Sequence, residues 1–207
     1  MTRIAGVSRQ DAGPTVKLAY WFTRRHMARL AGRETEQMIE PVTMYAHVPG
    51  VLRAYGMLEQ ATAKLKRLDE RYRALAELKA ATVTQCEYCI DLGSQIARRW
   101  GLSDDELLAL PSYRTSALFT DVDKLVLDYA VGMSSTPVTV TDTLFAKLRE
   151  HFDDAQLVEL THLIALENLR GRFNLALGVP AAGFSEGMTC AVPAPVPHPT
   201  RGDEGTN

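Results

Sequence analysis

Two cysteines separated by two residues are the part of this sequence best suited to chemistry. Cys86 and Cys89 stand in the stretch Cys-Glu-Tyr-Cys, and helix-forming residues precede and follow it. A cysteine three residues after another lies on the same helical face, so the two sulfurs can form a disulfide. A helix N-terminus also favours a thiolate, because it presents free backbone N–H groups and a partial positive charge. The spacing therefore predicts a thiol redox site.

Two other interpretations of this pair remain open. The C-x-x-C spacing is half of a zinc site, although the sequence has no second such pair, and the only other cysteine is Cys190. The pair can also pack without catalysing anything. We favour redox chemistry, because a lone pair of nearby cysteines in a reducing compartment is more often catalytic than structural.

The composition is that of an ordinary globular protein. Of the 207 residues, 46% are hydrophobic and 23% are charged, and the formal net charge is −2. This balance gives no electrostatic reason to expect a nucleic acid or an anionic membrane as partner. No apolar run approaches the roughly 20 residues of a membrane span, and the first residues lack the apolar core of a signal peptide. We expect a cytoplasmic protein and assign no cofactor and no metal.

The elements that position the cysteines are predicted to be helices. Capping residues, prolines and glycines divide the chain into about eight helices in one all-α domain over residues 1–189. This domain consists of N-terminal helices (1–66), a core around the cysteines (67–110) and C-terminal helices (120–178). Within the core, Asp69 caps one helix, and a second helix runs from about Cys86 to Trp100. The proline-rich stretch 190–207 is expected to be a disordered tail.

Three of the predicted helices have distinctive sequence patterns. In the helix that begins at Pro49, we expect Val51, Leu52, Tyr55 and Leu58 to face inward. In the helix from Asp69, alanines recur between leucines, which permits close helix packing. A capping-box pattern at residues 153–156 opens the longest helix, which ends before Gly178.

Around these residues the sequence resembles the alkylhydroperoxidase AhpD / carboxymuconolactone decarboxylase superfamily. The resemblance is sharpest at Cys86-Glu-Tyr-Cys89-Ile-Asp, and it extends over most of residues 40–185. It implies an AhpD-like helical fold that assembles into trimers or hexamers. It also implies an antioxidant peroxidase in which the second cysteine, Cys89, attacks a peroxide and Cys86 resolves the product. A dithiol partner then reduces the pair.

The proton relay of that family is missing at its usual positions. AhpD proteins carry a glutamate twelve residues before the first cysteine and a histidine four residues after the second. The corresponding residues here are Ala74 and Gly93. Only Cys86 and Cys89 therefore match the family's functional residues, and another group must move protons at the sulfurs.

Glu77 is the residue we predict to replace the missing glutamate. It lies three residues after Ala74, about one helical turn closer to the cysteines and on nearly the same face. It can accept a proton directly or through water if its helix packs beside Cys86. The alternative is a surface glutamate or a salt-bridge partner of Lys79 or Arg73.

The remaining polar residues of the resembling region have weaker claims. His162 is the only one of the five histidines that we consider as a distant proton acceptor, with a packed or hydrogen-bonded helix residue as the alternative. Glu87 is expected to point outward at the helix start, where its charge suits the dipole. Asn168, Arg172 and Asn174 are expected to make helix-packing or subunit contacts.

The function we predict is that of a thiol-dependent peroxidase or disulfide oxidoreductase. Cys89 attacks a peroxide as its thiolate, the sulfenic acid condenses with Cys86, and an external dithiol resets the pair. One alternative is a non-peroxidase enzyme of small-molecule metabolism that uses Glu77 as general base. Another is a binding or redox-sensing module in which the cysteines do not catalyse.

Overall fold

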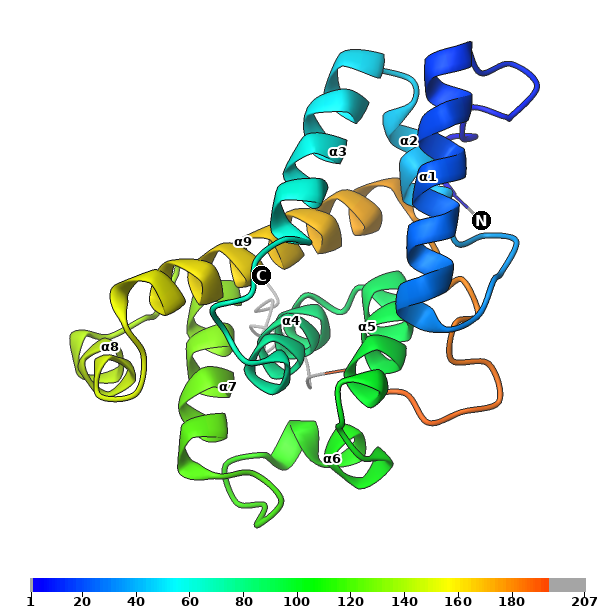
Figure 1. The fold of residues 1–207 in the computed structure, drawn as a ribbon. Coiled ribbons are helices and arrows are strands. Elements are labelled where there is room, and N and C mark those ends of the chain that lie inside the picture. Colours follow the sequence, from blue (N-terminus) through cyan, green and yellow to red (C-terminus); the bar gives the residue numbers. More distant parts are fainter. Residues whose placement is uncertain (1, 194–207) are drawn as a thin grey trace, which may run out of the picture.

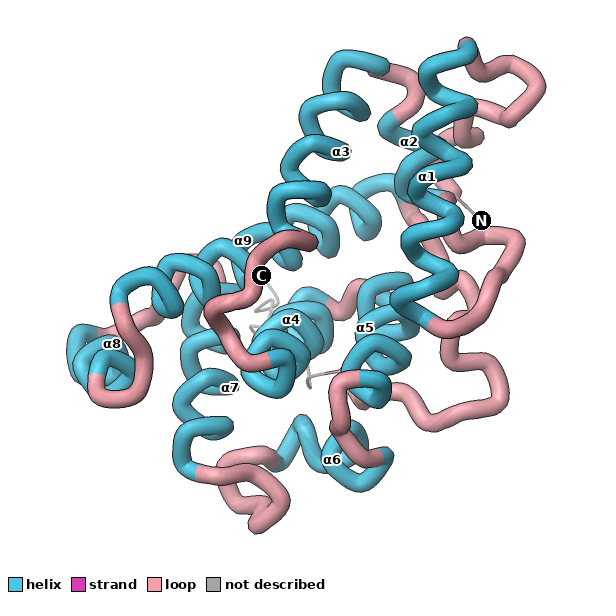
Figure 2. Tube along the Cα trace, viewed as in Figure 1, coloured by secondary structure: helices cyan, strands magenta, loops and turns pink. Residues whose placement is uncertain are grey.

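The protein is built from α-helices. The computed structural model describes residues 2–193, and within that range it contains helices, turns and loops but no strand (Figure 2). This confirms the predicted all-α class. Residues 194–207, most of the expected tail, lie outside the described part of the chain. No helix in the described range is long and apolar enough to cross a membrane. The helices are α1 (Pro14–Ala31), α2 (Glu40–Tyr45), α3 (Pro49–Thr62), α4 (Glu70–Thr84), α5 (Glu87–Arg99), α6 (Asp104–Ala109), α7 (Asp121–Ser134), α8 (Asp142–Arg149) and α9 (Asp154–Leu177), with a 3-10 turn at Leu110–Ser112.

The helix ends follow the local signals in the sequence. The Asp69 side chain accepts a hydrogen bond from the Arg71 N–H and caps α4. At the start of α9, Asp153 and Gln156 form a reciprocal capping box, as the pattern predicts. Gly178 ends α9 with φ of 68°, a left-handed conformation that glycine adopts without a steric cost. Local chemistry therefore sets where the helices of the site begin and end.

Helix α4 lies at the centre of the molecule. It contacts α5, α7 and α9, which surround it in Figure 1. Its alanines and leucines are buried on several sides, because small side chains let three neighbouring helices approach the same axis. The buried apolar residues of α4 are Ala74, Leu75, Ala76, Leu78, Ala80 and Ala81. This helix gives the site a rigid base.

Helices α1, α2 and α3 lie together at one side of the molecule (Figure 1), and their buried side chains form a second, smaller apolar cluster. Tyr45 stacks between Tyr55 and Phe173, with ring centroids 4.4 Å and 3.9 Å away, so α2 and α3 are tied to α9. On α3, the inward orientation predicted for Val51 and Leu58 is wrong, because both side chains are exposed. α3 packs through a narrow strip around Leu52, which leaves most of its surface uncovered.

The segment after α9 returns across α5. The buried Asp91 carboxylate accepts backbone N–H groups from Ala182, Phe184 and Ser185 at 2.6–2.9 Å. Further along, the Ala191 N–H donates to Ser94 on α5 at 3.0 Å. Asp91 thus holds a loop on the face of α5 that points away from α9, and this fixes the helix that carries the cysteines.

Candidate active site

A tight turn between α4 and α5 places the cysteines. α4 ends at Gln85, which adopts a left-handed conformation with φ of 59° and ψ of 32°. The next residue, Cys86, is extended and is the N-cap of α5. A left-handed turn at a non-glycine residue costs roughly 1–2 kcal/mol, so the surrounding packing must hold it. Because of this turn, the first residues of α5 face α9.

Cys86 and Cys89 form a disulfide at the N-terminus of α5. The Cys86 sulfur also accepts the Cys89 backbone N–H at 3.2 Å, as an N-cap side chain does. The two sulfurs are largely shielded from solvent, with Cys86 1% and Cys89 6% exposed. Of the two, Cys86 has the helix N–H that stabilises a thiolate, and Cys89 is the more accessible. This confirms that the chain brings the two cysteines together.

The amide of Asn174, on α9, contacts both sulfurs. Its Nδ2 lies 3.6 Å from the Cys86 sulfur and 3.6 Å from the Cys89 sulfur. Asn174 is buried, and its Oδ1 has no partner among the described residues. From the sequence we expected a helix-packing or subunit contact from Asn174. Instead it supplies one donor to the sulfurs and one unused acceptor directly beside them.

Gly171 allows α9 to approach the cysteines this closely. A β-carbon at this position would lie 2.8 Å from the Thr84 hydroxyl oxygen and 3.5 Å from the Cys86 β-carbon. The first distance is shorter than real β-carbons tolerate, so a larger residue would push α9 away. The contact between Asn174 and the sulfurs, one turn further along α9, depends on this approach.

The positions of the family's relay are packed against apolar atoms. Ala74 is buried inside the core around α4. A β-carbon at Gly93 would lie 3.2 Å from a methyl group of Leu78, so a side chain there would have to displace that leucine. The interface between α4 and α5 therefore fills the space where a relay histidine would begin.

Glu77 lies between two arginines. One carboxylate oxygen is 3.2 Å from Arg73 Nε, and the other is 3.2 Å from Arg170 Nη1. The Arg73 pair is the alternative we considered from the sequence, and no contact between Glu77 and a sulfur is found among the described residues. Both carboxylate oxygens of Glu77 are therefore engaged by guanidinium groups.

Arg170 binds three carboxylates, one from each of α3, α4 and α9. Its Nε and Nη2 bind Glu59 of α3 at 2.9 Å and 2.6 Å, a bidentate pair. Its Nη1 binds Glu167 of α9 at 2.9 Å as well as Glu77 of α4. We refer to Glu59, Glu77, Glu167 and Arg170 as the Arg170 cluster. On α9, Arg170 lies one helical turn before Asn174, and Glu167 lies one turn before Gly171, along the same face.

The members of this cluster differ in proton affinity. Burial, together with the nearby charges of Glu77 and Glu59, raises the pKa of Glu167 to about 7, although Arg170 opposes this. Burial also acts against ionisation of Glu59, but the charge and hydrogen bonds of Arg170 outweigh it and lower the pKa of Glu59. The cluster therefore holds one carboxyl group that exchanges its proton near neutral pH.

The other residues considered from the sequence lie elsewhere. His162 Nε2 is 2.8 Å from the Thr62 hydroxyl, and His162 stands more than three turns of α9 before Asn174, roughly 18 Å along the helix. Glu87 is exposed, which confirms its outward orientation. Asn168 donates to Ser134 of α7 at 2.9 Å, a helix-packing contact of the predicted kind.

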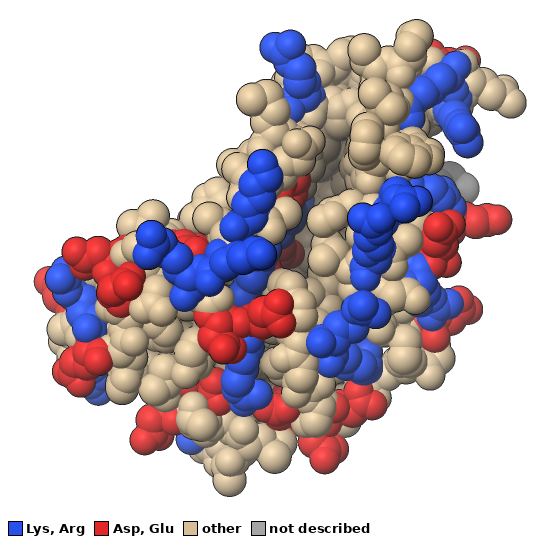
Figure 3. Space-filling model, in the orientation of Figure 1, with Lys and Arg blue, Asp and Glu red and all other residues tan. Residues whose placement is uncertain are grey.

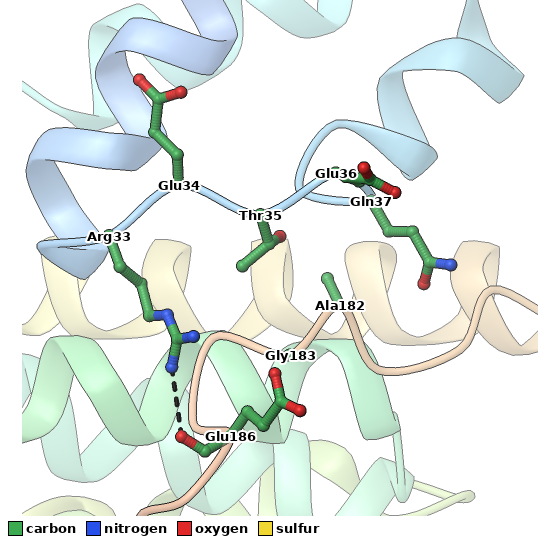
Figure 4. Close-up of a pocket in the computed structure, with 8 residues that line it drawn as sticks. All are labelled: Arg33, Glu34, Thr35, Glu36, Gln37, Ala182, Gly183 and Glu186. Atoms are coloured by element: carbon green, nitrogen blue, oxygen red, sulfur yellow. Dashed lines mark hydrogen bonds between the residues drawn. The ribbon is translucent and has the colours of Figure 1, made fainter.

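A surface cavity lies on a different side of the cysteine helix. Its volume is about 340 Å³, and it is bounded by residues 33–37 and by Ala182, Gly183 and Glu186 (Figure 4). Arg33 reaches across it and donates to the Glu186 carbonyl at 3.2 Å. Neither cysteine lines it, so this cavity is separate from the disulfide.

Sequence reasoning missed Asn174, Glu167 and Arg170. A signal for them exists in the spacing of Glu167, Arg170, Gly171 and Asn174, which puts all four on one face of a helix. A glutamate on the otherwise apolar face of a long helix should also prompt a search for its partner, because buried charges are nearly always paired.

Comparisons with known proteins agree with this geometry. Residues 49–131 match the model of the carboxymuconolactone decarboxylase family. The uncharacterised protein YnjA of Escherichia coli (strain K12) is 37% identical over 175 residues, which are 84% of this chain and 88% of YnjA. YdfG of Bacillus subtilis (strain 168) is 25% identical over 146 residues, 70% of this chain and 99% of YdfG.

Solved structures share the fold at lower identity. The debrominase Bmp8 superposes with a TM-score of 0.72 at 20% identity, over 89% of this chain and 94% of Bmp8. A peroxidase-related protein from Ralstonia eutropha JMP134, described as an alkylhydroperoxidase AhpD core, gives 0.68 at 19% identity, over 88% of this chain and 94% of that one. Taken with the relative in Escherichia coli, the helical fold and the cysteine pair show that this chain belongs to the carboxymuconolactone decarboxylase family and has an AhpD-like fold.

Proposed function

We propose that this protein is a thiol-dependent peroxidase or disulfide oxidoreductase that works through Cys86 and Cys89. The observation that carries the proposal is the disulfide at the N-terminus of α5, with the Asn174 amide donating to both sulfurs. This arrangement stabilises thiolates by hydrogen bonds and lets them interconvert with a disulfide. The substrate class is a small hydroperoxide, and the reductant is a dithiol.

The two cysteines have different tasks in this cycle. Cys89 is the more exposed and attacks the peroxide: a sulfur–oxygen bond forms, the oxygen–oxygen bond breaks, and the alcohol leaves with a proton. Cys86 then displaces hydroxide from the sulfenic acid and releases water. In the reductive half, an external thiolate attacks Cys89, and Cys86 leaves as the thiolate that the helix N–H stabilises.

Turnover of a hydroperoxide with a dithiol reductant tests this cycle. We expect Cys89→Ser to abolish turnover, and we expect Cys86→Ser to allow a single oxidation of Cys89 but no cycle. Cys190→Ser is the matched control, because Cys190 is a free cysteine outside this pair, and it should behave as wild type. The proposal fails if neither Cys86 nor Cys89 reacts faster than free cysteine near neutral pH.

Asn174 is assigned a direct role at the sulfurs in this proposal. A hydrogen bond to a charged group contributes roughly 1.5–3 kcal/mol, so Asn174→Ala should raise the thiol pKa by about one unit or more. Alkylation rates measured against pH report this change. Asn168→Ala removes an amide from the same helix that binds Ser134 instead, and it should leave the thiol pKa unchanged. Equal thiol pKa values in the two variants would contradict the role of Asn174.

The alternative enzyme, with Glu77 as general base, has less support. Both oxygens of Glu77 are engaged by arginines, and a base needs an oxygen that is free to take a proton. Glu77→Gln should therefore keep a substantial part of the peroxide rate. A complete loss of the reaction in Glu77→Gln, with the fold intact, would return Glu77 to the centre of the mechanism.

We also propose that the protein is a homo-oligomer, a trimer or a hexamer. Large apolar side chains are exposed on α1 and α3, among them Trp21, Phe22, Val51 and Met57, and such surfaces commonly mark protein contacts. A second copy of the chain is the partner we assign. Light scattering should give a lower mass for Trp21→Ser/Phe22→Ser than for wild type, whereas Val138→Ser, at an exposed valine in a loop, should not change it. A wild-type monomer would refute this assignment.

A further inference from the structure

The Arg170 cluster places an exchangeable proton on the face of α9 that contacts the cysteine sulfurs. On α9, Glu167 stands one turn before Gly171 and Arg170 directly precedes it, and Gly171 abuts Cys86. Asn174, one turn further, contacts both sulfurs. Glu167 and Asn174 are seven residues apart, about 10.5 Å along the helix axis, a separation that a short chain of ordered waters can span.

The charges around the cluster leave Glu167 as the member that binds a proton. Arg170 Nη1 is within hydrogen-bond distance of both Glu77 and Glu167, so two carboxylates share one nitrogen. Glu77 also pairs with Arg73, and Glu59 binds Nε and Nη2 of Arg170 in a bidentate pair. Two like charges so close together cannot both ionise without cost. The buried carboxyl of Glu167, with a pKa of about 7, is the one that takes the proton.

Ionisable groups on the neighbouring helices also affect the proton affinities within the cluster. Ionisable groups that act on the cluster come from five helices: Arg73 and Glu77 of α4, Tyr55 and Glu59 of α3, Tyr45 of α2, Tyr88 of α5 and His26 of α1, whose charge acts on Glu59. In Figure 3 the surface is hollowed between α1 and α3, and acidic side chains are visible at the bottom of the hollow.

We propose that Glu167 is the proton-holding residue of the thiol site and takes the place of the relay missing at Ala74 and Gly93. This inference rests on the proposed peroxidase function. The ionised Glu167 accepts the Cys89 thiol proton through water, and Arg170 holds it in position. The thiolate then forms a sulfur–oxygen bond with the hydroperoxide as the oxygen–oxygen bond breaks. The proton passes from Glu167 to the departing alkoxide, which leaves as alcohol, so sulfur is oxidised and the peroxide oxygen is reduced.

Glu167→Gln in the full chain tests the inference, with Glu59→Gln as the matched control. Both changes remove one carboxylate from Arg170 and keep the shape of the side chain. For wild type, the rate of peroxide reduction should depend on an ionisation near pH 7. We expect Glu167→Gln to lose this ionisation and about a hundredfold of the rate, in line with the usual contribution of general acid–base catalysis. Glu59→Gln should keep an ionisation of Glu167 but move it to lower pH, because the charge of Glu59 no longer raises the pKa of Glu167. Glu167→Asp should restore part of the rate.

Infrared difference spectra between the oxidised and reduced protein give a readout that does not depend on turnover. We expect a protonated-carboxyl band that changes on reduction in wild type and Glu59→Gln and is absent in Glu167→Gln. If wild type reduces peroxide and Glu167→Gln retains its rate, its pH dependence and that band, the inference is overturned while the proposed function stands. If Cys89→Ser is as active as wild type, the proposed function fails, and this inference fails with it.

Discussion

Replacement of Glu167 by glutamine should change how the stability of the protein depends on pH. Burial raises the pKa of Glu167 from the ordinary value of 4.5 to about 7, so the folded protein binds a proton that the unfolded chain releases between these values. Each tenfold difference in proton affinity corresponds to 1.36 kcal/mol. The folded wild type should therefore lose about 3 kcal/mol of stability from this group as the pH rises from about 4.5 to 7.

The sign follows from the direction of the pKa change. A carboxyl group with a raised folded-state pKa contributes its full stability below the unfolded pKa and loses it as the pH rises through the folded pKa. Glutamine at residue 167 stays neutral throughout. The difference in unfolding free energy between Glu167→Gln and wild type should therefore grow in favour of the variant from pH 4.5 to 7 and then level off.

Urea unfolding at a series of pH values, followed by circular dichroism, measures this difference. For Glu59→Gln the pH dependence of the stability difference should have the opposite sign, because the pKa of Glu59 is lowered in the folded protein. Ionised Glu59 stabilises the fold at neutral pH, and this stabilisation is lost as the pH falls through the folded-state pKa. A difference between Glu167→Gln and wild type that stays flat within about 0.5 kcal/mol from pH 5 to 8 would refute the reasoning, because Glu167 would then be ionised in the folded state.

Two further predictions concern the packing that positions the cysteines. Gly171→Ala should destabilise the protein by roughly 1–3 kcal/mol and slow the thiol reactions, because the new β-carbon would lie 2.8 Å from the Thr84 hydroxyl oxygen. Gly56→Ala is the control, because a β-carbon there would meet open space. Equal melting temperatures for the two variants would contradict this prediction. Asp91→Ala should leave three buried N–H groups without their acceptor and should increase hydrogen exchange at residues 182–185. Unchanged exchange there would show that another group holds the loop.

The fold was readable from the sequence because its signals are local. Asp69, the Asp153 capping box and Gly178 each act within a few residues, and each marks a helix end in the structure. The inward orientation of Val51 and Leu58 was not readable, because it depends on which neighbours cover α3. Periodicity shows that a helix has an apolar face, and only the tertiary arrangement shows how much of that face is covered.

The candidate site, too, was only partly predictable from the sequence. The cysteine pair and its place at a helix start are properties of a short stretch, and the sequence was sufficient to find them. Asn174, Arg170 and Glu167 all belong to α9 and are more than 80 positions after Cys86, and the close approach of α9 at Gly171 brings this helix to the cysteines. For Glu77, Arg73 was one of the salt-bridge partners that the sequence suggested, whereas Arg170 comes from the distant helix α9 and was not foreseen.

The proposal that Glu167 replaces the family's relay can be tested by restoring the family's residues at the usual positions. Ala74→Glu together with Gly93→His would recreate the AhpD pattern, yet Ala74 is buried and a β-carbon at Gly93 would already press on Leu78. An unpaired buried carboxylate costs several kcal/mol, and overpacking adds roughly 1–3 kcal/mol. In the Glu167→Gln background we therefore expect the double change to lower the melting temperature and to leave peroxide turnover low. Restored turnover with an unchanged melting temperature would mean that the usual relay positions remain open in this chain and that Glu167 was not needed to replace them.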